Sequence, residues 1–518
     1  MTSLGLTTEE DVWREELPGL GEVELRNIVT VIRGRSPSMV IVVAHRDNDG
    51  AGTAADNPSG TAALIELARP YGALGAAEPP VPQRTLVLVS TDGGAWGGAG
   101  AARLASRIGE QGDVVAVLVL HGLARPGVPQ LAIGAGAVAS PARALVGTAA
   151  ARVAEQVGVA PELPSAPAQL VALGIPLALG EQAPFLQRGM AAVALTGAPP
   201  DSGEAVDARV RVNALAGLGR AAEALIGSLD ATPRRSFGTA DSLFLDERRV
   251  VGGWALRLLL AIAVAPFAVG VVDLLARARR RGVSVRPAFR ALRSRILVCL
   301  YAGALLWLAT VVGVLPSGAQ YPFPPTGPAA GDWSPVGVGI LAAALVGGWA
   351  LARRRLARRL APSPSETLAG YVAALVWLGG LSVVVAAARP YAVLFLLPSL
   401  YAWLWLPRAS SHVARMALFA LGLSGPVGGV LVLAGSLGTS VSDVARYLVE
   451  LAGIGYIGPS TVLLALAWTA AAAQLGALAL GRYAPYAAGQ EPPPPGLVRT
   501  SVARAARRRA GTSQASGM

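Results

Sequence analysis

The 518-residue sequence has no lysine, a single cysteine, and only 15% charged residues. One cysteine, Cys299, excludes both an intrachain disulfide and a cysteine-ligated zinc site within one chain. The basic residues are therefore all arginines, and the formal net charge is +12. These arginines are concentrated in short segments between apolar runs and are not interleaved with aromatic residues. We therefore expect no nucleic-acid partner.

Hydrophobic residues make up 53% of the chain, and from about residue 251 onward they form runs of membrane-spanning length. Seven spans are predicted, at residues 252–275, 296–315, 336–352, 367–388, 391–406, 415–435 and 459–480. The middle of these runs is almost free of ionisable residues, which argues against a proton-coupled transporter or a charged ion pathway. The sequence thus predicts a membrane domain over 252–480 in contact with membrane lipids, followed by a disordered basic tail over 481–518.

Arginines gather on every second connection between the spans. Residues 277–295 contain eight and residues 353–359 contain five, whereas 316–335 and 436–458 contain almost none. The positive-inside rule then predicts a multi-pass protein of the plasma membrane, with a cytoplasmic C-terminal tail and an extracytoplasmic N-terminal domain. Residues 1–21 carry no apolar segment that could export such a domain. Two explanations stay open: a signal anchor upstream of this start, or a cytoplasmic domain.

Residues 22–230 alternate apolar strands with helical stretches. Runs of β-branched residues at 39–44, 85–90 and 114–120 are separated by Ala/Leu-rich stretches at 60–69 and 98–108. Strand-helix-strand order with fully apolar strands is typical of a sheet covered by helices on both faces. The prediction is a three-layer α/β sandwich with a central mixed, largely parallel sheet. A linker at 231–251 would connect it to the all-α membrane bundle.

Two stretches carry a family resemblance. Ala44–Asp47 reads AHRD, and Ala55–Arg69 reads ADNPSGTAALIELAR. They resemble the co-catalytic zinc aminopeptidases, a family that includes leucyl aminopeptidases and the transferrin receptor ectodomain. The resemblance implies a zinc-exopeptidase fold in which His45 ligates a metal, Asp47 orients that histidine, and Asp56 bridges two zinc ions. Imidazole and carboxylate groups suit zinc chemically.

The family's catalytic motif is altered. It reads Asp, small, Glu, Glu, any, Gly, Leu, any, Gly, Ser, and here residues 92–101 read DGGAWGGAGA. The glycines align without gaps. Gly94 then occupies the position of the general base, which deprotonates the metal-bound water, and Ala95 occupies that of a metal ligand. No catalytic residue is therefore predicted.

Two further ligand positions also differ. His121 stands where the resemblance places an aspartate ligand, and in residues 180–185 (GEQAPF) Gln182 replaces the last ligand histidine. Of the five family ligands only His45 and Asp56 are unchanged. Ordinary aminopeptidase chemistry is not expected from such a set.

The remaining residues allow two interpretations. His45, Asp56 and His121 could converge on one zinc ion, or they could form a hydrogen-bonded relic in which Asp47 holds His45 and Asp56 caps a helix. The second interpretation implies no cofactor. The residues predicted to line a ligand cleft are Asn57, Asp92, Trp96, Glu181 and Gln182.

Three functions stay open. The combination of a degenerate peptidase-like domain with many spans resembles the aminopeptidase-like subunit of the GPI transamidase, which implies recognition of a peptide, a protein partner or a lipid-linked ligand. A membrane-anchored metallohydrolase is the second, with Asp49, Asp92 or Glu181 supplying the missing carboxylate. The third is a transporter or lipid-handling protein in which the domain is accessory.

Overall fold

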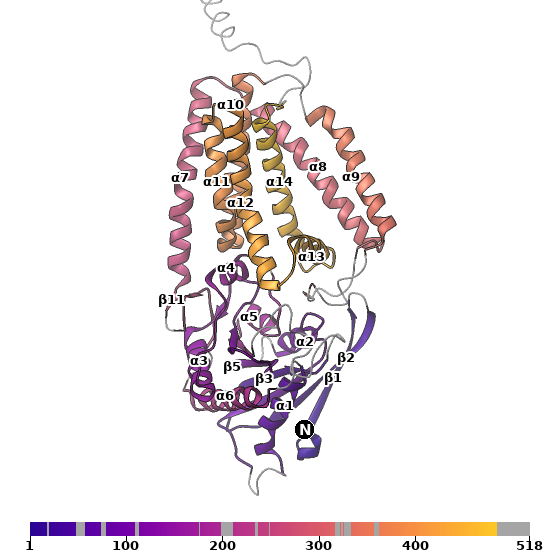
Figure 1. Cartoon of the computed structure of the whole chain (residues 1–518), viewed down its shortest axis with the longest axis vertical. Coiled ribbons are helices and arrows are strands. Elements are labelled where there is room, and N and C mark those ends of the chain that lie inside the picture. Colours follow the sequence, from indigo (N-terminus) through magenta and orange to yellow (C-terminus); the bar gives the residue numbers. More distant parts are fainter. Residues whose placement is uncertain are drawn as a thin grey trace, which may run out of the picture.

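The computed structural model describes most of the chain, in two parts that lie end to end (Figure 1). The described residues are 1–17, 20–47, 57–73, 79–108, 113–175, 177–197, 211–233, 237–247, 249–315, 322, 325, 333–356 and 362–483, without the side chains of 57 and 353–356. An α/β domain occupies one end and a helical bundle the other.

The α/β domain is built on a mixed sheet, seven-stranded in the described part of the chain. The strand order is β1 (Thr8–Leu17), β2 (Gly21–Ile32), β4 (Arg84–Thr91), β3 (Ser36–His45), β5 (Val114–His121), β8 (Ala192–Thr196) and β6 (Gln130–Ala132). The central strands β4, β3, β5 and β8 run parallel, whereas the other pairs are antiparallel. The predicted mixed, largely parallel sheet is confirmed.

Helices cover both faces of this sheet. One face packs against α1 (Asn57–Ala68), α3 (Arg143–Val157) and α6 (Val212–Ala231), and the other against α2 (Ala99–Ile108) and α5 (Ala183–Gln187). Within β3, Val40 and Val42 join the first core and Ile41 and Val43 the second. Because side chains alternate along a strand, an unbroken apolar run serves both layers.

The sheet begins at Thr8, before residue 22, where the sequence predicts the start of the domain. β1 is an edge strand with the sequence TEEDVWREEL and pairs with β2 along its whole length. Its charges obscure it as a strand, yet Asp11 forms ion pairs with Arg103 and Arg107 of α2. Charged residues are expected on an edge strand because they discourage pairing with other chains.

The predicted linker at 231–251 is attached to the domain by β9 (Thr239–Ala240), which pairs with β7 (Ser140–Pro141) of the domain. Within the linker, β10 (Leu243–Phe244) pairs with β11 (Val250–Val251). Gln169, in α4 (Ala166–Gly174), donates to the carbonyl of Phe244 and accepts from its amide. The connection is thus fixed by hydrogen bonds.

The bundle contains seven helices, among the described residues, that are long and apolar enough to cross a membrane. They are α7 (Gly253–Arg280), α8 (Arg286–Val311), α9 (Pro335–Leu356), α10 (Pro364–Ala388), α11 (Val393–Trp405) with the flanking turns η3 (Pro390–Ala392) and η4 (Leu406–Arg408), α12 (His412–Leu437) and α14 (Pro459–Ala479). The predicted number of apolar helices of membrane-spanning length is confirmed. The central helix α10 packs against α7, α8, α11 and α14.

A further helix, α13 (Val441–Gly453), lies across the domain-side end of the bundle, between α12 and α14 (Figure 1). The sequence treats this segment as part of a connecting loop. Ser440 caps the helix by accepting from the amide of Asp443, and Val444, Tyr447 and Leu451 form its buried side. A short helix with one apolar side is too polar overall to register as a span.

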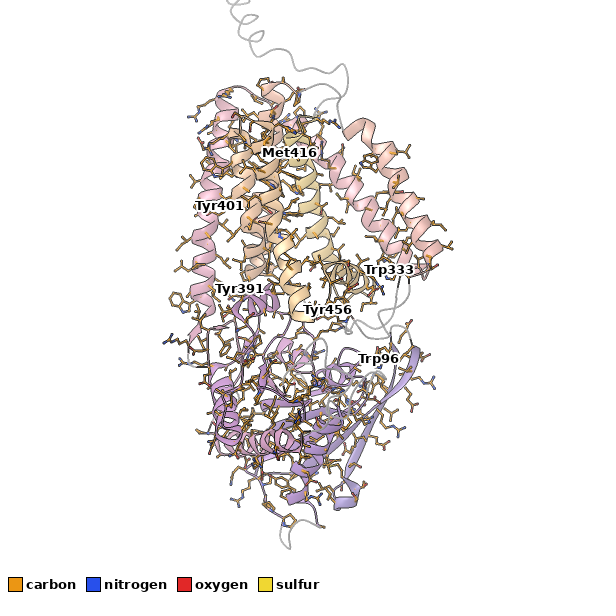
Figure 2. All side chains as sticks on the ribbon, in the orientation of Figure 1. Trp96, Trp333, Tyr391, Tyr401, Met416 and Tyr456 are labelled. Carbon is orange, nitrogen blue, oxygen red and sulfur yellow. The ribbon has the colours of Figure 1, made fainter. Side chains whose placement is uncertain are left out.

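The two parts meet through specific contacts. The side chain of Tyr391, in η3, hydrogen-bonds to the backbone and the carboxylate of Asp241, and Arg257 of α7 forms an ion pair with the same carboxylate. Arg389 donates to the carbonyl of Gly136 in the domain. α4 packs against η3 and α12. Figure 2 shows Tyr391 and Tyr456 at this junction.

Candidate functional site

Strand register places three polar residues side by side at the carboxyl ends of the parallel strands. His45 of β3 pairs with Thr91 of β4, and the pairing of Val43 with Val119 sets His121 of β5 opposite His45 from the other side. All three are an even number of residues from the apolar residues that face α2 and α5. They therefore project from the same face of the sheet.

The two histidines contact each other directly. Nε2 of His45 lies 2.9 Å from Nδ1 of His121, and the rings stack with their centroids 5.0 Å apart. His45 is buried, with 6% of its surface exposed, whereas His121 is partly exposed. One ring nitrogen donates and the other accepts, so each histidine fixes the tautomer of its neighbour.

Asp47 connects His45 to the altered catalytic loop. Its carboxylate lies 3.5 Å from Nδ1 of His45 and accepts hydrogen bonds from the amides of Gly94 and Ala95 at 2.8 and 2.9 Å. Burial acts to raise the pKa of Asp47, but His45 and the two amides outweigh burial and lower the pKa below its ordinary value. Asp47 therefore remains ionised and orients both the histidine and the loop.

Gly94 lies under the ring of His45. A Cβ at this position would collide with Cβ and Cγ of His45 and lie 2.5 Å from Nδ1. No side chain fits at Gly94 while His45 keeps this conformation. The position that the resemblance assigns to the general base is thus filled by the neighbouring imidazole.

Glu181 is a buried carboxyl group beside the histidines. Thr91 donates from Oγ1 to Oε1 of Glu181 at 2.5 Å, and only 4% of the glutamate surface is exposed. The other oxygen, Oε2, is buried and has no hydrogen-bond partner among the residues that the structure describes. Burial raises the pKa of Glu181, although the charge of His45 and the bond from Thr91 oppose it. We name His45, Asp47, Thr91, His121 and Glu181 the histidine cluster.

Two other predicted cleft residues make contacts at the rim of this cluster. Gln182 is buried and donates to the carbonyls of Gly134 and Leu179, which commits its amide nitrogen to the backbone. Trp96, two residues after Gly94, is partly exposed and packs against apolar clusters of both the β1–β2 hairpin and the bundle.

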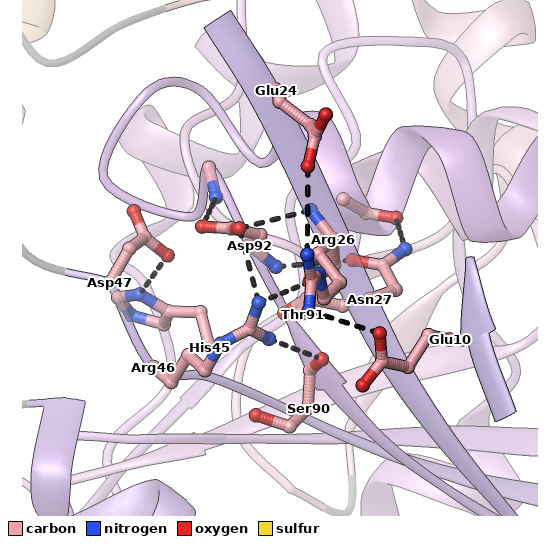
Figure 3. Close-up of polar contacts among 12 residues, drawn as sticks. Glu10, Glu24, Arg26, Asn27, His45, Arg46, Asp47, Ser90, Thr91 and Asp92 are labelled. Atoms are coloured by element: carbon pink, nitrogen blue, oxygen red, sulfur yellow. Dashed lines mark hydrogen bonds and ion pairs between the residues drawn. The ribbon is translucent and has the colours of Figure 1, made fainter. Parts of the chain in front are cut away.

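Asp92 belongs to a second polar group, which Figure 3 shows next to the first. Its carboxylate accepts from the amide of Arg26 and forms a 3.1 Å ion pair with Arg46. Asn27, fully buried, accepts from the amide of Asp92 and donates to the carbonyl of Gly100. We name Arg26, Asn27, Arg46 and Asp92 the arginine cluster. The sequence indicated only Asp92 of this group, and as a cleft residue.

The arrangement does not fit the two-zinc site of the family, as far as the described residues show. They contain no group of three or more ligand side chains that could hold a metal. His45 and His121 share a hydrogen bond, and Asp47 is bonded by two amides. Asp49, Asp56 and the side chain of Asn57 lie outside the described residues, so the role predicted for Asp56 stays a prediction.

Several solved structures are similar to this chain. A glutaminyl cyclase from an Acidobacteriales bacterium shares 17% identity and a TM-score of 0.34, over 44% of this chain and 81% of that one. An aminopeptidase from Aneurinibacillus sp. strain AM-1 has 14% sequence identity and a TM-score of 0.34, and the match covers 42% of this chain and 50% of that one. A zinc aminopeptidase from Bacillus subtilis has 15% sequence identity and a TM-score of 0.32, and the match covers 44% of this chain and 54% of that one.

Sequence comparison gives a family for the α/β domain. No curated protein matches the chain. The model of the family described as Peptidase family M28 matches residues 27–202. These residues hold the histidine cluster, most of the sheet and the altered catalytic loop. The chain therefore carries a Peptidase family M28 domain at residues 27–202.

Proposed function

We propose that this protein is a multi-pass membrane protein whose M28 domain lies outside the cytoplasm and recognises a ligand or partner without hydrolysing it. The observation that carries this proposal is the position of His45 over Gly94. The family's general base acts from that position, and here an imidazole held by Asp47 fills it. A domain that keeps the fold and loses the base retains a shaped surface for binding.

The distribution of arginine along the bundle supports the orientation. α7 runs from the domain to Arg277–Arg280 at the far end, and α8 begins there at Arg286. Arg408 ends η4, and Arg415 lies in the first turn of α12, next to Met416, which Figure 2 shows toward the same far end. The described domain-side ends carry fewer arginines. The positive-inside rule places the far end in the cytoplasm and the domain outside.

Recognition also agrees with the groups that the cluster offers. His121 is partly exposed, and Glu181 has an oxygen without a hydrogen-bond partner in the part of the chain that the structure describes. Both are fixed by neighbours, His121 by His45 and Glu181 by Thr91. Polar groups held in place before a ligand arrives lose little entropy on binding.

A second candidate function is a metallohydrolase with a non-standard site. Glu181 favours it, because a buried carboxyl group with a raised pKa next to two histidines is a feature of catalytic sites. In this case Glu181 would act in place of the absent general base. The metal content of the protein distinguishes the two functions.

The deciding experiment measures zinc by elemental analysis in the full-length protein, purified in lipid nanodiscs and dialysed. Wild type is compared with His45→Ala and with His412→Ala, a histidine at the start of α12 far from the site. We expect less than one-tenth of a zinc ion per chain in all three proteins and no peptide hydrolysis. Zinc near one or two per chain that only His45→Ala removes would overturn the proposal.

Orientation is tested separately by thiol labelling. Cys299 is the only cysteine, so a Cys299→Ala background allows one introduced thiol at a time. Ser106 is exposed in the α/β domain and Ser284 is exposed at the far end of α7. We expect a membrane-impermeant maleimide to label Ser106→Cys on intact cells and Ser284→Cys only after permeabilisation. The opposite pattern would place the domain in the cytoplasm.

A further inference from the structure

We infer that the ligand of the histidine cluster comes from the membrane: an amphiphile whose polar, hydrogen-bond-donating group binds at Glu181 and whose acyl chain lies along Trp96 and α13. This inference rests on the proposed recognition function and names its ligand class. It depends on which way the site faces, on what its loop contacts, and on the carboxylate oxygen of Glu181, which is buried without a hydrogen-bond partner among the described residues.

The site faces the bundle. The loops that follow the carboxyl ends of the parallel strands are the parts of the domain that meet the membrane helices. Gly136 accepts a hydrogen bond from Arg389, and Tyr456 hydrogen-bonds with the backbone of Ala178 and the side chain of Gln187. Gln187 ends α5, the helix that starts directly after Gln182. The segment that positions Glu181 is therefore anchored to the bundle.

The altered catalytic loop reaches the same surface. Trp96 packs against a cluster that includes Val444, Tyr447 and Leu451 of α13, together with Leu177 of the domain. It also contacts the cluster of the β1–β2 hairpin. The loop that carries Gly94 and Ala95 therefore joins, through one large apolar side chain, the same apolar cluster as α13.

α13 lies at the level expected for the membrane surface. It joins the ends of two predicted spans, runs across them and buries one apolar side (Figure 1). Glu450, also buried in α13, accepts from Nε1 of Trp333 and from Arg446, at 2.7 and 2.9 Å. Amphipathic helices and tryptophan side chains are typical of the boundary between lipid and water. Trp96 and Trp333 both lie at this end of the bundle (Figure 2).

Glu181 indicates the polar group. Leaving Oε2 buried without a hydrogen bond from the described residues is unfavourable, and a hydrogen-bond donor on the ligand would remove that cost. Asp47, beside His45, is the second carboxyl group of the histidine cluster. Two neighbouring carboxyl groups disfavour phosphate and favour an amide, hydroxyl or amine. The cluster thus fits the head of an acylated amide better than that of a phospholipid.

The experiment compares two probes that differ only in the acyl chain. Full-length protein in nanodiscs is photolabelled with a diazirine-bearing N-palmitoyl dipeptide amide, and labelled peptides are identified by mass spectrometry. Competitors are the N-palmitoyl and the N-acetyl forms of the same dipeptide amide without the diazirine. We expect labelling on 92–98 and α13, and at least tenfold stronger competition by the palmitoyl form.

Variants identify the polar contact. Glu181→Gln keeps the oxygen that accepts from Thr91 and replaces the acceptor Oε2 by a donor, so we expect labelling to fall at least tenfold. The control is Glu155→Gln, which changes an exposed glutamate in α3. Trp96→Phe should reduce the preference for the palmitoyl form and keep the loop packed.

The other outcomes distinguish failure of this inference from failure of the proposed function. Equal competition by both forms would mean a soluble ligand. Labelling confined to the lipid-facing helices α7 and α9, or unchanged by Glu181→Gln, would mean unspecific partitioning. Cleavage of the probe together with bound zinc would contradict the proposed function instead, and would leave a membrane-borne substrate in place.

Discussion

The same strand ends carry two polar clusters with opposite character. In the arginine cluster, Asp92 is bonded to Arg46 and to backbone amides, and Asn27 has a partner at each end of its side chain. In the histidine cluster, Glu181 keeps a buried oxygen that has no hydrogen-bond partner among the described residues. A cluster whose groups are bonded internally stabilises the fold, whereas a group left without a partner indicates binding.

The motif AHRD contributes to both clusters. His45 and Asp47 belong to the histidine cluster, and Arg46 between them belongs to the arginine cluster. Figure 3 shows His45 beside Asp47, and Arg46 extending in another direction to Asp92. Neighbouring residues of one motif therefore have different tasks, and substitutions should separate stability from ligand binding.

The largest effect is expected from Gly94→Ala. The new Cβ collides with the ring of His45, and overpacking of this kind costs about 1–3 kcal/mol. The free energy of unfolding, measured by denaturant titration of the protein in nanodiscs, should fall by that amount. The substitution tests whether His45 fills the position of the family's general base.

A double variant supplies the control for Gly94→Ala. His45→Gly removes the atoms that the new Cβ meets, so the two changes together should destabilise less than the sum of their separate effects. Additive effects would show that His45 does not lie on Gly94. The histidine cluster would then be more open than the structure has it.

A smaller effect is expected from Asn27→Ala. The change leaves the amide of Asp92 and the carbonyl of Gly100 without their buried partner, at a cost of about 2 kcal/mol. The melting temperature should drop, but photolabelling of the protein that remains folded should not change. Glu181→Gln should instead reduce photolabelling and leave the melting temperature unchanged. Loss of labelling in Asn27→Ala at a temperature where the protein is folded would show that the arginine cluster also contributes to ligand binding.

The sequence predicted the histidine cluster better than the arginine cluster. His45 and His121 each end an apolar strand, and parallel strands bring such ends together, so their proximity follows from local patterns. Asp92 meets Arg26 only because β2 pairs antiparallel with β4, a register that no short motif encodes, whereas Arg46 reaches Asp92 from the end of the parallel neighbour β3. The pairing of distant strands depends on the whole sheet.

Two elements were not predicted from the sequence, for a related reason. β1 is an edge strand whose charges conceal the strand pattern, and α13 is an amphipathic helix between two spans. Both are polar on one side, and both are stabilised by packing against the rest of the protein. Glu181 was predicted to line the cleft, but its bond from Thr91 needed the register of β4.

The smallest effect is expected from Asp11→Asn, at the edge of the sheet away from both clusters. Burial acts to raise the pKa of Asp11, but Arg103 and Arg107 outweigh it, so the folded protein holds this pKa below its ordinary value of about 3.9. A lowered pKa stabilises the fold above the unfolded pKa, and this stabilisation is lost as the pH falls through the folded pKa. The loss of folding free energy in Asp11→Asn at pH 7 should be about 1 kcal/mol or less, because both arginines are partly exposed.

Melting temperatures of Asp11→Asn and wild type should therefore differ at pH 7 and converge near pH 3. The control Asp113→Asn changes an exposed aspartate and should match wild type at both pH values. A difference that persists at low pH would show that β1 is held by contacts other than these ion pairs, and that the edge strand, like the arginine cluster, depends on hydrogen bonds that acid does not remove.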